Sequence, residues 1–99
     1  MAVRLIIAPE AEQDLDEAYG WYEGRRLGLG EEFLSCVDAS IESISRTPEM
    51  YPPVHENYRR ALVRRFPYAV FYEYVQDAVT IFSVFHSSRD PNKWRQRFP

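Results

Sequence analysis

The chain has 99 residues, of which 45% are hydrophobic and 15% aromatic, and this composition predicts one folded domain over residues 1–99 and excludes a disordered chain. No apolar run approaches the roughly 18 residues of a membrane span, and acidic residues follow the first apolar segment at once, so we expect a soluble, cytoplasmic protein without membrane contact. The single cysteine, Cys36, excludes an intramolecular disulfide and a cysteine-based metal cluster. We interpret it as a buried structural thiol.

Charge is distributed unevenly along the chain, although the formal net charge is only −3. Residues 1–57 contain 4 arginines and 12 carboxylates, a balance of −8, whereas residues 58–99 contain 8 basic and 3 acidic residues, a balance of +5. The split indicates an acidic outer layer and a basic working surface. Acidic helices that are simply solvated would explain it equally well.

The first half of the chain predicts a strand followed by two helices. Residues 4–8 (RLIIA) form a short apolar strand, and Pro9 then stands where its missing N–H costs least, at the start of a helix. The two apolar stripes of helical period are Ala11, Leu15, Ala18, Tyr19 and Tyr22, with Trp21 at the edge, and Phe33, Leu34, Val37, Ile41 and Ile44. Gly28 and Gly30 separate the helices, and the second runs from about Gly30 to Ser45. We therefore expect an antiparallel helical hairpin with two buried stripes.

The second half predicts a sheet. The proline-rich segment from Pro48 to Pro53 is expected to lack regular structure. Three alternating segments follow, residues 59–65, 68–74 and 79–86, separated at Phe66-Pro67 and by a turn at Gln76-Asp77. They predict an antiparallel meander, and a short C-terminal helical turn is expected over 92–97. The fold class is therefore α+β, in the order β-α-α-β-β-β, with the antiparallel sheet packed by the N-terminal helical hairpin.

Strict alternation assigns the side chains of the last two strands to two faces, and both faces are apolar. In the last strand it places Val79, Ile81, Ser83 and Phe85 on one face and Thr80, Phe82, Val84 and His86 on the other. The helical hairpin can cover only one of these faces. We expect the other to be an exposed partner-binding surface. The alternative is that the C-terminal tail around Trp94 and the proline loop cover it.

Metal and cofactor chemistry finds little support in the sequence. His55 and His86 are the only histidines and lack the spacing of metal ligands, and there is no Gly-rich phosphate loop. We therefore expect no metal and no cofactor. A Ser-His-Asp arrangement of Ser87, His86 and Asp90 is disfavoured, because neighbouring residues of one loop rarely present that geometry.

RNA cleavage is the more serious catalytic possibility. Attack by a 2′-hydroxyl needs an acid, a base and cations on the phosphate. His86 is the candidate acid or base. The candidate cations are Arg59, Arg60, Arg64, Arg65 and Arg89. If the chain is a nuclease, the catalytic candidates are His86, Arg89, Arg60 and Arg65. The structural reading is equally good: an Arg89–Asp90 ion pair at the sheet edge and a hydrogen-bonded His86.

Four segments carry a resemblance to a known family: PEAEQDLDEAYGWY, FLSCVDASIESI, RRALVRRFPYAVFYEY and VFHSSRDPNKW. Together with the order of elements, they resemble the RelE/ParE superfamily of type II toxin–antitoxin toxins over nearly the whole chain. The last two segments are the specific ones and resemble the ParE-like, plasmid-stabilisation branch. The resemblance implies a cytoplasmic bacterial toxin that is neutralised by a cognate antitoxin.

The two branches of that superfamily differ in what the resemblance implies. RelE-like members cut mRNA in the ribosome with basic residues on the sheet and often a C-terminal tyrosine, whereas ParE-like members inhibit DNA gyrase without that catalytic set. Here Ala69 stands where an arginine is common among the nucleases, the tail NKWRQRFP has no tyrosine, and overall acidity disfavours direct nucleic-acid binding.

The resemblance therefore favours a gyrase inhibitor that acts by binding. A ribosome-dependent endoribonuclease or a non-toxic antitoxin-binding homologue are the alternatives. The residues predicted to contact partners are Arg59, Arg60, Arg64, Arg65, Arg89 and Trp94.

Overall fold

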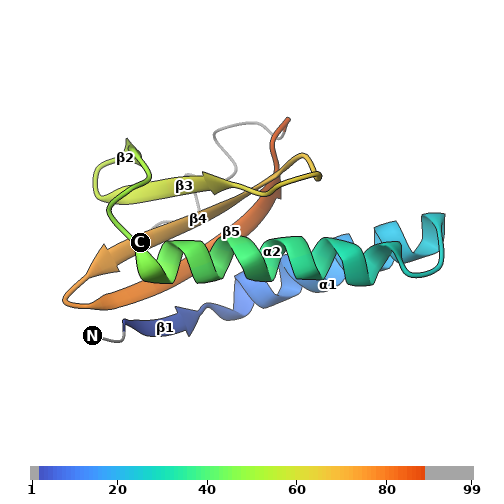
Figure 1. Ribbon diagram of the computed structural model, residues 1–99, viewed down its shortest axis with the longest axis horizontal. Helices are drawn as coiled ribbons and strands as arrows, with labels where there is room; N and C mark the ends of the chain where they lie inside the picture. The colour runs from blue at the N-terminus through green and yellow to red at the C-terminus, as the bar shows by residue number, and fades with distance from the viewer. Residues whose placement is uncertain (1–2, 89–99) are drawn as a thin grey trace.

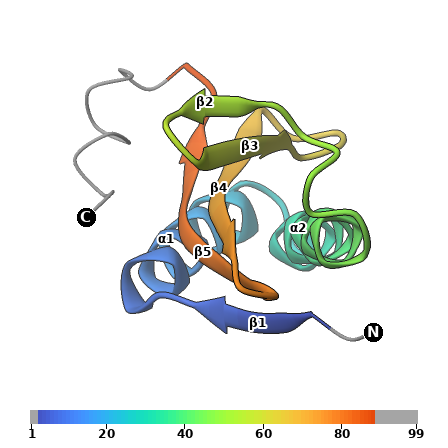
Figure 2. The same ribbon diagram turned by 90° about the vertical axis from the view of Figure 1, so that its left-hand side faces the viewer.

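The computed structural model describes residues 3–88 and consists of two long helices packed on one side of a five-stranded sheet (Figures 1 and 2). The elements in chain order are β1 (Arg4–Ile7), α1 (Pro9–Arg25), α2 (Leu29–Arg46), β2 (Pro53–His55), β3 (Tyr58–Leu62), β4 (Tyr68–Val75) and β5 (Ala78–His86). The strand order in the sheet is β1-β5-β4-β3-β2. The α+β class and the predicted order of a strand, a helical hairpin and a three-strand meander are confirmed.

The sheet differs from the prediction at its two edges. β3, β4 and β5 form the antiparallel meander, but β1 runs parallel to β5, with Arg4 opposite Ala78, so the sheet is mixed. The helical hairpin between β1 and the meander is the kind of long crossover that parallel pairing needs. At the other edge, the proline-rich segment contains the short strand β2, which pairs with the start of β3. An edge strand tolerates Pro53 because an N–H on its outer side is not needed.

Both helices bury most of the stripes that their periodicity predicts, but Leu15, Tyr19 and Leu34 are only partly buried. Phe33, Val37, Ile41 and Ile44 of α2 are all buried, and Cys36 is half-buried against the same core. In α1, however, Asp14 is buried and Leu15 only partly so. The side of α1 that faces β5 therefore contains a carboxylate as well as apolar groups.

The core lies between the hairpin and the inner face of the sheet. Tyr72, Ile81 and Val79 from the strands are fully buried in it. At one end the rings of Phe33 and Phe66 lie 5.3 Å apart, centroid to centroid, in an edge-to-face arrangement. Figure 1 shows the hairpin turn projecting beyond the strands at this end of the molecule.

A bulge in β5 corrects the predicted side-chain faces of that strand. The pairing with β4 shifts, so that Phe71 lies opposite Ser83 but Tyr72 lies opposite Ile81. Because the extra residue reverses the alternation, Val84 packs in the inner core beside Ile81, while Phe85 belongs to the outer face. The expectation that Val79, Ile81, Ser83 and Phe85 share one face is therefore wrong.

The outer face of the sheet is not the exposed patch that we expected. Ala69, Phe71 and Phe85 are buried there as a second small cluster, and Val54 of β2 packs against them. Val54 directly follows the proline-rich segment, so this region of the chain supplies part of the cover, in line with the alternative interpretation. The helical turn predicted over 92–97 lies outside the described residues. Among those described, no helix has the length and apolar character needed to cross a membrane.

Candidate partner-binding surface

The structure divides the four arginines around β3 into two pairs, of which one is engaged within the protein. The guanidinium of Arg59 donates hydrogen bonds to the main-chain carbonyls of Glu49 and Tyr51. β3 ends at Leu62, three residues earlier than predicted. Arg65 lies in the turn that follows, with a left-handed backbone (φ of 71°), and its guanidinium donates to the Glu32 carboxylate at 2.9 Å. Both side chains therefore hold loops in place.

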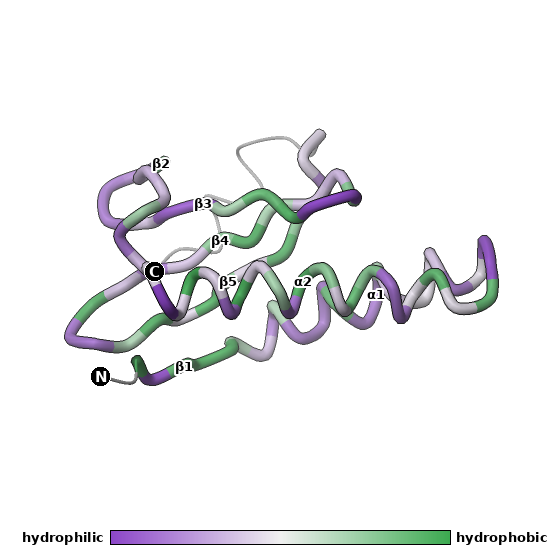
Figure 3. Tube along the Cα trace, viewed as in Figure 1, coloured by the Kyte–Doolittle hydropathy of each residue, from purple (hydrophilic) through white to green (hydrophobic). Residues whose placement is uncertain are grey.

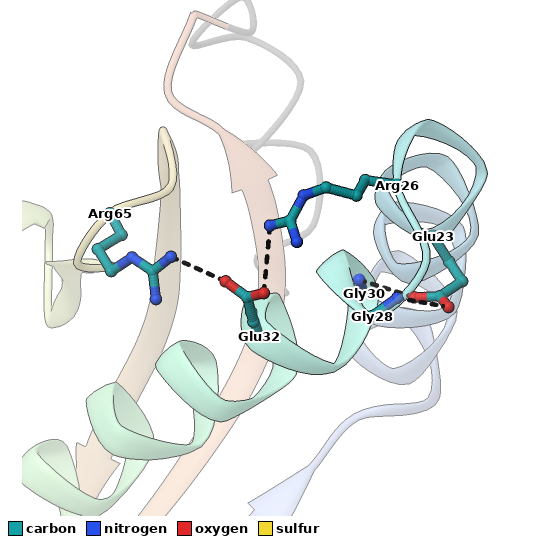
Figure 4. Close-up of polar contacts among 6 residues, drawn as sticks. All are labelled: Glu23, Arg26, Gly28, Gly30, Glu32 and Arg65. Carbon is teal, nitrogen blue, oxygen red and sulfur yellow. Dashed lines mark hydrogen bonds and ion pairs between the residues drawn. The ribbon is translucent and has the colours of Figure 1, made fainter.

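Glu32 is the point where the hairpin turn and the β3–β4 turn are joined (Figure 4). Its carboxylate accepts from Arg65 at 2.9 Å and from Arg26 at 3.1 Å. These two hydrogen bonds, that of Arg65 first, lower the pKa of Glu32 below its usual value, and the pKa of Arg65 is raised in return. The neighbouring Glu23 carboxylate accepts the main-chain N–H groups of Gly28 and Gly30, each at 2.9 Å, and so closes the turn between the helices.

Arg60 and Arg64 form the second pair. Both are exposed, and neither takes part in an ion pair between described residues. The turn that contains Arg64 is the strongly hydrophilic segment after β3 in Figure 3. These two arginines are thus available to a partner, whereas Arg89 and Trp94 lie outside the described residues.

A groove of about 490 Å³ lies on the other side of the molecule, between α1 and the adjacent ends of β4 and β5. We call it the α1 groove. It is lined by Asp14, Glu17, Ala18, Trp21, Tyr22, Pro67, Tyr68, Val84, Phe85 and His86. Trp21 is 55% exposed at its rim, with the guanidinium of Arg25 stacked 4.2 Å from the ring centre. An aromatic side chain exposed to this degree beside an apolar groove is typical of a protein-binding surface.

Asp14 ties the wall of this groove to the sheet. Pairing between β1 and β5 ends at Ile81, and beyond it the Asp14 carboxylate accepts the main-chain N–H of Val84 at 3.0 Å. The carboxylate thus takes the place of a further strand at this edge. Glu17 is exposed one turn further along α1. Among the described residues that line the groove, two are carboxylates and none is arginine or lysine.

His86 lies half-buried in the same groove, at the end of β5. Its ring is 5.3 Å from that of Tyr68, and its Nδ1 accepts the main-chain N–H of Ser88 at 3.1 Å and lies 2.7 Å from the Ser88 hydroxyl. The neutral ring therefore carries its proton on Nε2. Within the described residues the hydroxyl beside His86 is that of Ser88, not Ser87, and Asp90 lies outside them.

The candidate acid or base, His86, shares its groove with carboxylates, while Arg59 and Arg65 are held in other contacts. Within residues 3–88 no group of three or more potential ligands is placed to hold a metal ion.

Of the residues that line the α1 groove, only His86 is a candidate site residue from the sequence alone. Trp21 was placed only at the edge of a stripe, and Glu17 and Tyr68 were given no role at the surface. The sequence contains one sign of this groove, which is the position of Trp21. A large aromatic residue beside the apolar stripe of a helix, and not within it, is only partly covered by the protein core.

The chain is similar to known proteins in both sequence and fold. The family model described as the ParE toxin of a type II toxin–antitoxin system, parDE, matches residues 5–91. The toxin ParE2 of Mycobacterium tuberculosis is 30% identical over 93 residues, which cover 93% of this chain and 89% of that protein.

Two solved structures show the same fold. A chain of the chromosomal ParDE system of P. aeruginosa superposes with a TM-score of 0.77 at 13% identity, over 86% of this chain and 96% of that one. The isolated RelE toxin of E. coli superposes with a TM-score of 0.67 at 14% identity, over 96% and 95% of the two chains.

Proposed function

This chain belongs to the ParE toxin family of type II toxin–antitoxin systems, and from that premise we propose that it is a toxin that inhibits DNA gyrase by binding to it and is held inactive by a cognate antitoxin. It acts in the cytoplasm, where gyrase is found. No covalent step is part of this function. The surface that contacts gyrase includes the available arginines of the β3 end, Arg60 and Arg64.

The observation that carries the choice of gyrase over mRNA is the distribution of cations. A nuclease of this fold needs cations close to its acid or base, to stabilise charge on the phosphate. The described lining of the groove at His86 contains Asp14 and Glu17 instead. Ala69 is fully enclosed by Phe71 and Phe85, so no phosphate-binding side chain can extend from that position. Both features favour recognition of a protein.

The test compares two activities of the purified chain. We expect it to inhibit supercoiling by gyrase at stoichiometric concentrations and to leave ribosome-bound mRNA intact. Substitution of His86 by alanine should leave inhibition of gyrase within about twofold, because His86 lies in the α1 groove and is not part of the arginine surface. Cleavage of ribosome-bound mRNA that is lost in His86→Ala would contradict the proposal and support the endoribonuclease alternative. A chain without either activity that still binds an antitoxin is the third possibility.

The antitoxin is proposed to dock an apolar segment in the α1 groove. Burial of the exposed half of Trp21 removes on the order of 100 Å² from water, which at about 25 cal/mol per Å² contributes about 2.5 kcal/mol. Trp21→Ala should therefore weaken antitoxin binding roughly 50-fold. Met50→Ala is the matched control, because Met50 is similarly exposed but lies outside the groove. Equal affinities of the two variants would show that the antitoxin binds elsewhere.

A further inference from the structure

A second groove lies along the opposite edge of the sheet, between α2 and the end of β3. We call it the α2 groove. Its volume is about 430 Å³, and it shares no lining residue with the α1 groove. Its lining includes Ser40, Ser43 and Arg46 of α2, Tyr51, and Leu62 and Arg64 from the end of β3. The small hydroxyl side chains of α2 leave room for another chain to lie close to the helix.

The strand edge beside this groove is open. In the described part of the chain, β2 pairs with β3 only at Tyr58 and Arg59. The main-chain N–H of Val63 donates to the carbonyl of Tyr68 in the next strand. Because main-chain groups of a strand alternate in direction, the N–H and C=O of Leu62 point away from β4, beyond the reach of β2. An open edge of this kind is a template for a further strand.

The groove is also positively charged. Arg64 and Arg46 both line it, and none of its described lining residues is a carboxylate. Arg64 is exposed and forms no ion pair with a described residue, while Arg46 has only a long contact of 3.8 Å to the exposed Glu42. Leu62 lines the same groove and is 64% exposed. Apolar contact and positive charge thus occur together at an unpaired strand edge.

We propose that the α2 groove binds an extended, acidic segment of a partner protein, which adds to the open edge of β3 as a further strand. The segment pairs its main chain with the N–H and C=O of Leu62 and packs an apolar side chain on the same residue. Its carboxylates bind Arg64 and Arg46. Strand addition of this kind takes its affinity from the main chain and its specificity from alternate side chains. The site is separate from the α1 groove and can be occupied together with it. It shares Arg64 with the surface proposed to contact gyrase, so the segment competes with gyrase for that residue.

Nucleic acid fits the same features less well. Phosphates would use the two arginines, but they neither pair with a main-chain edge nor cover an exposed leucine. Arg59 and Arg65, which would extend a phosphate track along β3, are held by Tyr51 and Glu32. The observations therefore favour a peptide over RNA or DNA.

The experiment uses the full chain and a fluorescein-labelled peptide of alternating valine and glutamate, acetyl-VEVEVEV-amide. Binding is followed by fluorescence anisotropy. Two matched peptides are compared with it: one has lysine in place of glutamate, and one is N-methylated at every residue, so that neither of its edges can donate a main-chain N–H to β3. We expect only the parent peptide to bind, and the exchange of the Leu62 amide with solvent to slow when it does.

Arg64→Glu should weaken binding about fivefold or more, since an exposed attraction becomes a repulsion. Arg4→Glu makes the same charge change on β1, the strand furthest from β3 in the sheet, and should have no effect beyond general charge. The proposal is overturned if the parent peptide does not bind at millimolar concentration, if the N-methylated or lysine peptide binds as well, or if both substitutions act equally. Displacement of the peptide by a seven-nucleotide RNA of greater affinity would assign the groove to nucleic acid and also overturn it.

Discussion

Asp14 offers the sharpest test of how α1 is fixed to the sheet. Its side chain is only 7% exposed, and its carboxylate accepts the N–H of Val84 at 3.0 Å where β1 no longer pairs with β5. A hydrogen bond to a charged group contributes about 1.5–3 kcal/mol and a neutral one about half of that. Asp14→Asn keeps an acceptor oxygen and should cost about 1 kcal/mol. Asp14→Ala leaves the Val84 N–H without its acceptor and should cost about 2–3 kcal/mol.

Urea unfolding at pH 7 measures these differences, and amide exchange at Val84 reports on the bond itself. Asp16→Ala is the control, because Asp16 is exposed on the same helix and its substitution should change the free energy of unfolding by about 0.5 kcal/mol or less. The reasoning is refuted if Asp14→Ala is no more destabilising than Asp16→Ala and if the Val84 amide exchanges no faster in it.

Three further predictions concern stability. A Cβ at Gly30 would lie 2.8 Å from the ring of Tyr19, so Gly30→Ala should destabilise the fold by about 1–2 kcal/mol in thermal unfolding. Gly24 in α1 has open space around it, so Gly24→Ala should stabilise the fold by up to about 1 kcal/mol in the same assay. The pKa of Glu32 is lowered in the folded protein, so its ionised carboxylate stabilises the fold above its usual pKa of 4.5. The unsubstituted protein should therefore be more stable than Glu32→Gln at pH 6, and this difference should disappear as the pH falls below 4.5. The Tyr72 hydroxyl donates to the Pro48 carbonyl, so Tyr72→Phe should lower the free energy of unfolding by about 1 kcal/mol at pH 7. Because burial raises the pKa of Tyr72 to about 12, the unsubstituted protein should lose more stability than Tyr72→Phe as the pH rises from 10 to 12 in urea unfolding.

The helices and the meander were predictable because their signals are local. The recurrence of Phe33, Val37, Ile41 and Ile44 defines one face of a helix whatever surrounds it, and Gln76-Asp77 marks a turn, in which both residues have positive φ. The parallel pairing of β1 was not predictable in this way. It depends on how the helical hairpin packs on the sheet and so on which strand lies beside β1, and no short stretch of sequence specifies this.

The errors at the site have the same origin. The bulge in β5 reverses the faces of Val84 and Phe85, but Phe82, Ser83 and Val84 suit either face of a buried sheet, so the alternation contains no sign of it. Asp14 resembles any solvated helical carboxylate, because its acceptor role depends on a main-chain N–H 70 residues away.

The arginines show a further limit of sequence reasoning. Arg64 and Arg65 are chemically identical neighbours, and only the left-handed backbone of Arg65 and the position of Glu32 separate an available side chain from a structural one. The arginines were therefore predictable as a group and not as individuals. The exposed Trp21 was visible in the sequence, but its groove is assembled from α1, β4 and β5.

The central claim is that this ParE-family chain acts on gyrase by binding and does not act on mRNA. The most direct test is the order of events after the chain is induced in bacteria without its antitoxin. We predict that incorporation of labelled thymidine into DNA falls first, with plasmids losing negative supercoils, while incorporation of labelled methionine continues through the same minutes. A fall in methionine incorporation that precedes any change in DNA synthesis or supercoiling would contradict the account.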